Sequence, residues 1–159
     1  MSTKTAVFAG TFDPVTNGHV DLVLRARRLF PRVIVSVVRG TDTLFDEAER
    51  IALLTEALAE IDGLVIEGFT GLVVEQARRH GAAALVRGMR SFQDWDYETQ
   101  MAFANRGLAD EIDTVFLPPS PGMTNISSSL VREVASLGGD VSGWVPPHVE
   151  RALKAKVGG

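Results

Sequence analysis

Residues 5–38 read TAVFAGTFDPVTNGHVDLVLRARRLFPRVIVSVV, and this stretch decides the fold. It opens and closes on short apolar runs, at 5–9 and 33–38. The second run is rich in Val and Ile, which is typical of a strand buried on both faces. Between the runs, Leu22, Ala26, Leu29 and Phe30 recur at helical spacing. A strand, a helix and a second strand in this order predict two parallel strands joined by a crossover helix.

The same alternation continues along the rest of the chain. Further strands are expected at 64–67, 84–87 and 114–117. Further helices are expected after a capping box formed by Asp46 and Glu49, at about 72–80 and 95–106, at 128–137, and after Pro146-Pro147. Glycines are expected to end three of these helices, at Gly81, at Gly107 and at Gly138-Gly139. The repeated pattern predicts an α/β fold with a parallel sheet, whose ligands bind beyond the carboxyl ends of the strands.

Composition narrows the class of protein further. A length of 159 residues predicts one domain, and 45% hydrophobic residues allow a sizeable core. Sixteen basic against twenty acidic residues give a net charge of −4, which argues against a nucleic-acid partner. There is no cysteine, so no disulfide framework or thiolate nucleophile is expected. No apolar run is long enough for a membrane span and the chain start does not resemble a signal peptide, so we expect a cytoplasmic protein without a membrane partner.

The loop after the first expected strand is the strongest candidate site. It reads GTFDPVTNGH over residues 10–19 and leads directly into a helix. The unpaired N–H groups and the dipole at a helix start favour phosphate, and Thr11, Thr16 and His19 add side-chain donors. A plain turn followed by a surface histidine is the alternative interpretation. Two standard phosphate motifs, Gly-x-Gly-x-x-Gly and the Walker A loop, are absent.

Three later segments carry further candidate groups. Residues 87–90 (RGMR) place two arginines at the end of an expected strand, where they bind phosphate or are simply solvated. Residues 94–98 (DWDYE) combine acids with aromatic side chains that could equally be core anchors. The serines at 127–129 start a helix, where they serve as caps or as donors to an anion. A Gly-x-Ser-x-Gly elbow is absent, and the histidines show no metal-binding spacing, so no metal ligand is predicted.

Together these segments resemble a known enzyme family. GTFDPVTNGH, RGMRSFQDWDYE and ISSSLVREVASLGGDV, in this order, are similar to bacterial phosphopantetheine adenylyltransferases. The residues Thr16-Asn17-Gly18-His19 match the (H/T)-x-G-H signature of the wider nucleotidyltransferase superfamily. The resemblance implies a Rossmann-like five-stranded parallel sheet with helices on both faces and a homohexamer built as a dimer of trimers. It implies transfer of the adenylyl group of ATP to 4′-phosphopantetheine with Mg²⁺, which yields dephospho-coenzyme A and pyrophosphate.

The resemblance also implies roles for individual residues. Thr11, His19 and Arg90 would be catalytic. The ATP site would be formed by Thr11, Phe12, His19, Gly88, Met89, Arg90, Glu98, Met123, Thr124, Asn125, Ile126, Ser127, Ser128 and Ser129. The phosphopantetheine site would be formed by Thr11, Val73 and Arg87. Substrate phosphate would attack ATP directly, so catalysis would need positioning and charge stabilisation rather than a protein nucleophile.

Two segments depart from the family pattern. The loop after the second strand, 39–45 (RGTDTLF), is shorter than usual and lacks the family's phosphate-binding lysine. The aromatic-Ser-Phe usual before the serines is replaced by Met123-Thr124-Asn125. We hypothesise that Arg39 supplies the missing cation on the phosphopantetheine side; the alternative is that Arg39 is solvated or pairs with Asp42. These departures leave two other functions open, a sister nucleotidyltransferase acting on another phosphorylated acceptor and a non-catalytic nucleotide-binding protein.

Overall fold

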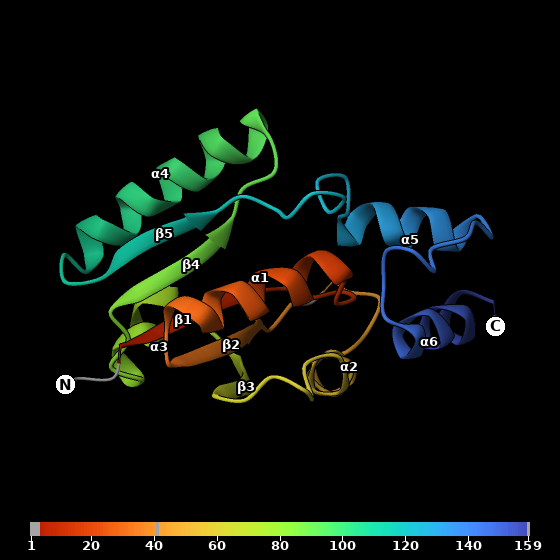
Figure 1. Cartoon of the computed structure of the whole chain (residues 1–159), viewed down its shortest axis with the longest axis horizontal. Helices are drawn as coiled ribbons and strands as arrows, with labels where there is room; N and C mark the ends of the chain where they lie inside the picture. Colours follow the sequence, from red (N-terminus) through yellow and green to blue (C-terminus); the bar gives the residue numbers. More distant parts are fainter. Residues whose placement is uncertain (1–3, 41, 159) are drawn as a thin grey trace.

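A computed structural model describes residues 4–40 and 42–158 and confirms the α/β fold. Five parallel strands form one sheet in the order β3-β2-β1-β4-β5 (Figure 1). The strands are β1 (Thr5–Gly10), β2 (Arg32–Val38), β3 (Leu64–Phe69), β4 (Ala84–Gly88) and β5 (Asp113–Leu117). The helices are α1 (Asn17–Leu29), α2 (Glu47–Ala57), α3 (Val73–Arg79), α4 (Phe92–Leu108), α5 (Ser128–Ser136) and α6 (Pro147–Val157).

The strand order determines where a ligand can bind. The chain runs from β1 to β2 and β3 on one side, then returns to place β4 and β5 on the other side of β1. This reversal opens a crevice at the carboxyl ends of β1 and β4, the usual ligand position in an open parallel sheet. The loops after β1 and β4 both carry candidate phosphate-binding residues. The fold therefore brings two sequence-distant candidate segments to one edge of the sheet.

Each face of the sheet has its own hydrophobic core. Alternate residues of β1 point to opposite faces, so Phe8 belongs to one core and Val7 to the other. The first core packs the sheet against α1 and α2 and extends to α5 and α6, and the second packs it against α3. In Figure 1, α5 and α6 lie beyond the carboxyl ends of the strands, next to the crevice. The predicted helices on both faces are confirmed.

The helix boundaries confirm some local predictions and correct others. Asp46 and Glu49 form the expected reciprocal capping box at the start of α2. Gly81 follows the end of α3 with a φ of 61°, a conformation that favours glycine. The expected end of α4 at Gly107 is wrong, because the helix continues through it to Leu108 and the N–H of Ala109 still bonds to the carbonyl of Asn105. A glycine inside a helix costs only about 1 kcal/mol, which the surrounding turns offset.

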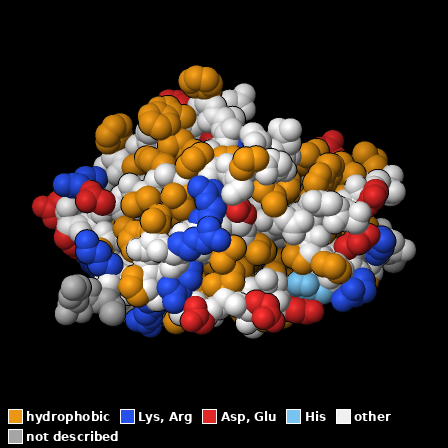
Figure 2. Space-filling model, viewed as in Figure 1, with side chains coloured by type: hydrophobic (Ala, Val, Ile, Leu, Met, Phe, Trp, Pro, Cys, Tyr) orange, Lys and Arg blue, Asp and Glu red, His pale blue; other side chains and the backbone are white. Residues whose placement is uncertain are grey.

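Two helices present apolar side chains to solvent. In α1, Leu29 was expected on the buried stripe but is 58% exposed, and the helix buries Val23 instead. In α4, Phe92 and Phe103 are 94% and 78% exposed, and Trp95 and Tyr97 are more than half exposed. Figure 2 shows hydrophobic side chains standing out over α4, at the upper left of this face. No helix in the described ranges is both long and apolar enough to cross a membrane.

Candidate active site

Two cavities of similar size open at the carboxyl edge of the sheet. The first, about 390 Å³, lies among the loop after β1, the end of β4 and the start of α5. The second, about 400 Å³, lies on the α3 and α4 side of the sheet. The residues that line both are Ala9, Gly10, Thr11, Arg87 and Glu98. The two cavities therefore meet at the carboxyl ends of β1 and β4.

The loop after β1 is held in an uncommon backbone conformation. Phe12 has a φ of 51°, in the left-handed region that non-glycine residues rarely adopt. Its ring is buried, with edge contacts to the rings of Phe8 and His19. A Cβ at Gly10 would come within 3.1 Å of that ring, so glycine is what allows the close approach. Next to this buried ring, Thr11 is exposed and lines both cavities.

His19 takes part in the cap of α1. Its Nδ1 accepts a 3.0 Å hydrogen bond from the N–H of Thr16, and the His19 N–H donates back to the Thr16 hydroxyl. This is a capping box in which histidine replaces the usual glutamate. Because Nδ1 is the acceptor, the proton of the neutral ring is on Nε2. His19 lines the first cavity, so it can offer a neutral N–H donor there.

The surroundings of His19 keep it neutral. Burial, followed by the positive charges of Arg90 and Arg87, lowers its pKa from 6.5 to about 4. In the free protein at pH 7 the ring therefore carries no charge. It is a hydrogen-bond donor of fixed orientation rather than an imidazolium ion.

Arg87 and Glu98 form the wall between the two cavities. Arg87 Nε and Nη2 donate to the two carboxylate oxygens of Glu98 at 2.8 and 2.6 Å, and Nη1 donates to the carbonyl of Ala9 at 2.6 Å. The Glu98 hydrogen bonds raise the pKa of Arg87, so the guanidinium stays charged. The resemblance assigns the two residues to the sites of different substrates, and nothing in the sequence indicates that their side chains pair.

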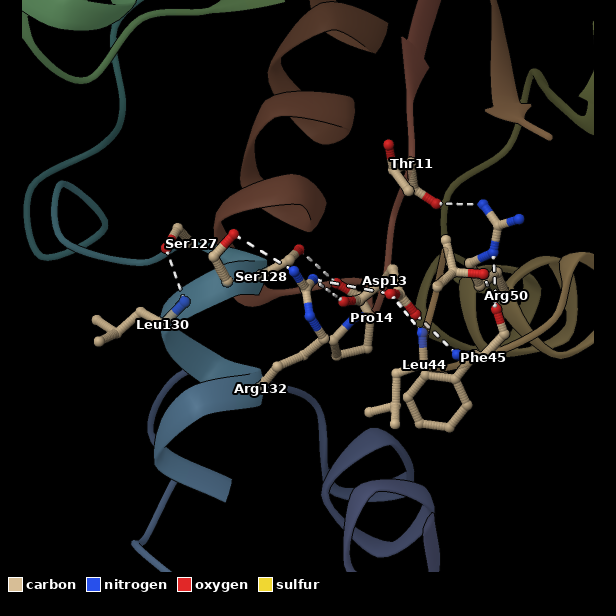
Figure 3. Close-up of polar contacts among 12 residues, drawn as sticks. Thr11, Asp13, Pro14, Leu44, Phe45, Arg50, Ser127, Ser128, Leu130 and Arg132 are labelled. Carbon is tan, nitrogen blue, oxygen red and sulfur yellow. Dashed lines mark hydrogen bonds and ion pairs between the residues drawn. The ribbon is translucent and has the colours of Figure 1, made fainter. Parts of the chain in front are cut away.

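Arg90 joins the end of β4 to the segment before α5. Its Nη1 donates to the carbonyl of Ile126 at 3.0 Å, and its backbone N–H donates to Asp94. The serines at the start of α5 prove to be both caps and tethers. Ser127 caps the helix by accepting from the N–H of Leu130, and the Ser128 hydroxyl donates to the carbonyl of Pro14 in the loop after β1 (Figure 3).

Asp13 is an important residue that the sequence analysis did not single out. Its buried carboxylate accepts hydrogen bonds from the N–H groups of Leu44 and Phe45 at 2.8 and 2.9 Å (Figure 3). The loop after β1 thereby holds the shortened loop after β2. Arg132 of α5 was also missed; it lines the first cavity, donates to the Asp13 carbonyl at 2.5 Å and lies 3.7 Å from the carboxylate. The sequence feature that points to Arg132 is its position one helical turn after the serines at 127–129.

The structure brings most of the predicted residues together and leaves a few outside. The predicted ATP-site residues that line the first cavity are Thr11, Phe12, His19, Gly88, Met89, Arg90, Glu98, Met123, Ile126, Ser127, Ser128 and Ser129. Thr124 and Asn125 are exposed and are not part of that lining. Val73 lines the second cavity together with Arg87.

Arg39 lies outside the described lining of both cavities. Its side chain is 64% exposed, and its Nε donates to Glu47 at 2.5 Å rather than pairing with Asp42. Asp42 and Thr43 line the first cavity instead, while residue 41 of the same loop lies outside the described residues. The expected proximity of Arg39 to a substrate is therefore absent from the described geometry.

The described lining of the first cavity has no excess of positive charge. It contains Arg87, Arg90 and Arg132 against Asp13, Asp42, Asp94 and Glu98. Each of these arginines lies within 4 Å of a carboxylate partner, at 2.6 Å for Glu98, 3.5 Å for Asp94 and 3.7 Å for Asp13. A highly charged anion entering this cavity would therefore need an accompanying cation or rearranged ion pairs.

The family model and the relatives in sequence agree on one family, and a solved structure shares the fold. Residues 7–134 match the model of the cytidylyltransferase-like family. The chain is 49% identical to the phosphopantetheine adenylyltransferase of Methylococcus capsulatus, over 98% of this chain and 97% of the relative. It is 46% identical to that of Desulfosudis oleivorans, over 98% of this chain and 94% of the relative. Its fold is similar to a bifunctional NMN adenylyltransferase/ADP ribose pyrophosphatase from Francisella tularensis complexed with AMP and a manganese ion. The TM-score is 0.72 at 16% identity, over 98% of this chain and 49% of that one.

Proposed function

Because this chain belongs to the phosphopantetheine adenylyltransferases of the cytidylyltransferase-like family, we propose that it transfers the adenylyl group of ATP to 4′-phosphopantetheine. The products would be dephospho-coenzyme A and pyrophosphate, a step of coenzyme A biosynthesis. The observation that carries the proposal is the meeting of two cavities at Thr11 and Arg87. ATP would occupy the first cavity and 4′-phosphopantetheine the second, with their reacting phosphates where the two join.

The chemistry is a direct displacement between two bound substrates. A phosphate oxygen of 4′-phosphopantetheine forms a bond to the α-phosphorus of ATP. The bond from that phosphorus to the bridging oxygen breaks, and the oxygen leaves with pyrophosphate. No protein nucleophile takes part, so the chain contributes by holding both substrates in line and stabilising the charge that develops.

The residues at the junction suit these tasks. The neutral Nε2–H of His19 and the hydroxyl of Thr11 would donate to the α-phosphate as its negative charge increases. Because Nδ1 is already held by Thr16, the His19 ring loses no orientational freedom at that moment. Arg87 would bind the acceptor phosphate, while Arg90 and Arg132 would contact the ATP side. Serines 127–129 would bind the β- and γ-phosphates at the start of α5.

Magnesium would enter with ATP. No cluster of three or more side chains suited to a metal ion occurs in the described ranges, so the ATP phosphates themselves would supply most ligands. This fits the charge of the first cavity, whose lining has more carboxylates than arginines. When bound, the ion would neutralise part of the polyphosphate charge. Asp42 of the lining would be a side chain able to contact its water shell.

A turnover assay tests the proposal. Pyrophosphate release from ATP would be measured with and without 4′-phosphopantetheine, and the product identified by mass spectrometry, with His19→Ala as the control. We expect release only when the acceptor is present. Release only with a different phosphorylated acceptor would favour a sister nucleotidyltransferase. No release with any acceptor would favour a nucleotide-binding protein that has lost turnover.

The exposed face of α4 supports a contact between subunits. Phe92, Trp95 and Phe103 lie on one side of the helix at helical spacing, and each is more than half exposed. We propose that it packs against other copies of the chain in the hexamer that the resemblance implies. Light scattering after size-exclusion chromatography tests this, since Phe103→Asp should reduce the assembled mass and an unchanged mass would exclude this face.

We also propose a cytoplasmic location, because the reaction consumes ATP; cell fractionation would test it.

A further inference from the structure

Arg50 of α2 is a buried cation at the back of the loop after β1. Its side chain is 0% exposed. Its Nη1 donates to the carbonyls of Thr11 and Val38 at 2.7 and 2.9 Å, and its Nε donates to the carbonyl of Phe45 at 3.2 Å (Figure 3). One guanidinium thereby joins the loop after β1, the end of β2 and the end of the shortened loop.

Stability alone explains this arginine poorly. Among the described residues no carboxylate lies within 4.0 Å of its nitrogens, and Nη2 is buried without a hydrogen-bond partner. Burying a charge without a close ionic partner costs several kcal/mol. Its position directly behind the loop after β1, which lines the first cavity, points instead to a role in that site.

The bond to Thr11 sets the direction of one peptide group. The carbonyl of Thr11 and the N–H of Phe12 belong to the same planar peptide and point in opposite directions. Because Arg50 holds the carbonyl from inside the protein, the N–H of Phe12 is directed to the cavity side. No described residue accepts a hydrogen bond from it. Figure 3 shows the Thr11 side chain also pointing away from Arg50.

The same bond supports a strained conformation. Phe12 has a φ of 51°, and such residues cost roughly 1–3 kcal/mol unless their surroundings hold them. Without Arg50, rotation of this peptide would relieve the strain and turn the Phe12 N–H away from the cavity. The hydrogen bond from Arg50 therefore keeps the Phe12 N–H available as a donor, although the backbone conformation this requires is disfavoured for phenylalanine.

We propose that Arg50 is a positioning residue for adenylyl transfer, acting through the Thr11–Phe12 peptide. It directs the Phe12 N–H and the Thr11 hydroxyl to the α-phosphate of ATP and ties the shortened loop to the same point. The inference rests on the proposed function and adds a residue that contacts neither substrate.

The kinetic test uses Arg50→Met, Arg50→Lys and a matched control, Arg27→Met. Arg27 also donates to two backbone carbonyls, those of Asp62 and Phe30, but at the opposite end of the sheet. We expect Arg50→Met to lower kcat at least about tenfold, with KM for 4′-phosphopantetheine changed less than about threefold. Arg50→Lys should recover part of the loss, and Arg27→Met should keep the wild-type kcat. A wild-type kcat in Arg50→Met, or equal losses in both Met variants, would overturn the inference.

A second variant pair tests the route through Thr11. If both residues act on the same peptide, the losses in kcat from Arg50→Met and Thr11→Ala combine to less than their product in the double variant. Full multiplication of the two losses would show that Arg50 acts elsewhere. Should Arg50→Met not fold, Arg50→Lys decides: a lowered kcat at unchanged melting temperature supports the inference, and a wild-type kcat overturns it.

A binding experiment separates this inference from the proposed function. ATP is added to ¹⁵N-labelled protein, and the amide resonance of Phe12 is followed by NMR, without any acceptor or turnover. We expect a shift in the wild type that is lost in Arg50→Met and kept in Arg27→Met. If the wild type released no pyrophosphate yet showed this pattern, the proposed function would fail, while the part of the inference in which Arg50 directs the Phe12 N–H to bound ATP would stand. An equal shift in Arg50→Met would overturn that role even in an active enzyme.

Discussion

The loop after β1 and the loop after β2 approach the same cavity but are held in place by different kinds of contact. The first contains its own cap, in which Thr16 and His19 bond to each other across three residues. The second depends on other parts of the chain, since Leu44 and Phe45 bond to Asp13, more than 30 residues away in sequence. Local hydrogen bonds therefore orient His19, whereas the shortened loop takes its shape from its neighbours.

This difference bears on the loop at 39–45, which contains no lysine. A loop whose position is set by Asp13 and Arg50 can change length and composition while the loop after β1 keeps its geometry. In the first cavity, positive charge comes from other elements, through Arg87, Arg90 and Arg132.

Substitution of His19 by alanine should have the largest effect. If His19 stabilises charge that exists only in the transition state, kcat should fall by about a hundredfold, or about 3 kcal/mol, with little change in ATP affinity. Steady-state kinetics and calorimetric titration with ATP would measure the two quantities. A variant with normal turnover would reduce His19 to a cap of α1.

The arginines of β4 test whether the two cavities serve different substrates. Arg87→Ala should raise KM for 4′-phosphopantetheine and Arg90→Ala should raise KM for ATP, each by roughly tenfold or more. Because Arg87→Ala leaves the buried Glu98 without its partner, it should also lower the melting temperature, and Arg87→Ala/Glu98→Gln should restore part of it. Equal changes in both KM values would show that the division of the cavities is wrong.

Asp13→Asn breaks the tie between the two loops. In aspartate, each carboxylate oxygen accepts one backbone N–H, from Leu44 or from Phe45. In asparagine, one of these oxygens is replaced by an NH₂ group, which cannot accept a hydrogen bond, so the loop at 39–45 should loosen. We expect a loss of about 1–3 kcal/mol in stability and a fall in kcat of about tenfold or less. Urea denaturation and hydrogen exchange at Leu44 and Phe45 would measure the loosening. Unchanged exchange at both amides would show that the shortened loop holds its own shape.

The pKa of His19 sharpens the description of the first loop. Burial and the neighbouring arginines lower it to about 4, so NMR of the free protein should show a neutral ring at pH 6. The unfolded chain takes up this proton near pH 6.5 and the folded chain does not. Stability is therefore lost as the pH falls from about 6.5 to 4 and is flat with respect to this group above that range. Titration near 6.5 in the folded protein would show a solvated ring away from the arginines.

Arg39→Ala should have the smallest effect and separates two interpretations of the second loop. The hypothesis that Arg39 replaces the lysine expects kcat/KM to fall at least about tenfold. The exposed pair with Glu47 instead favours a change of less than about twofold, with unchanged stability. Measuring kcat/KM for Arg39→Ala and for the control Glu47→Gln would decide between the two interpretations. If the two residues form only a surface ion pair, both variants should show equally small effects.

Much of the architecture was predictable because its signals are local. The apolar run of β2, the capping box of Asp46 and Glu49 and the alternation of strands and helices all depend on residues within a few positions of one another. Predictions made from weaker local signals failed, as at Gly107, where a single glycine did not end α4. The expectation of one domain and the roles assigned to individual site residues stay predictions.

The sequence by itself determined the order of the elements, the sheet class and the phosphate-favouring loop that starts α1. Only the tertiary structure decided which charges meet, as shown by the pairing of Arg87 with Glu98, of Arg39 with Glu47, and by the burial of Arg50 behind Thr11. The physical reason is the separation along the chain between the groups that make each contact. Helical periods, caps and strand runs are formed by neighbours in the chain, whereas the contacts of Arg50 with Thr11 and of Arg132 with Asp13 span 39 and 119 residues and exist only once the sheet has folded.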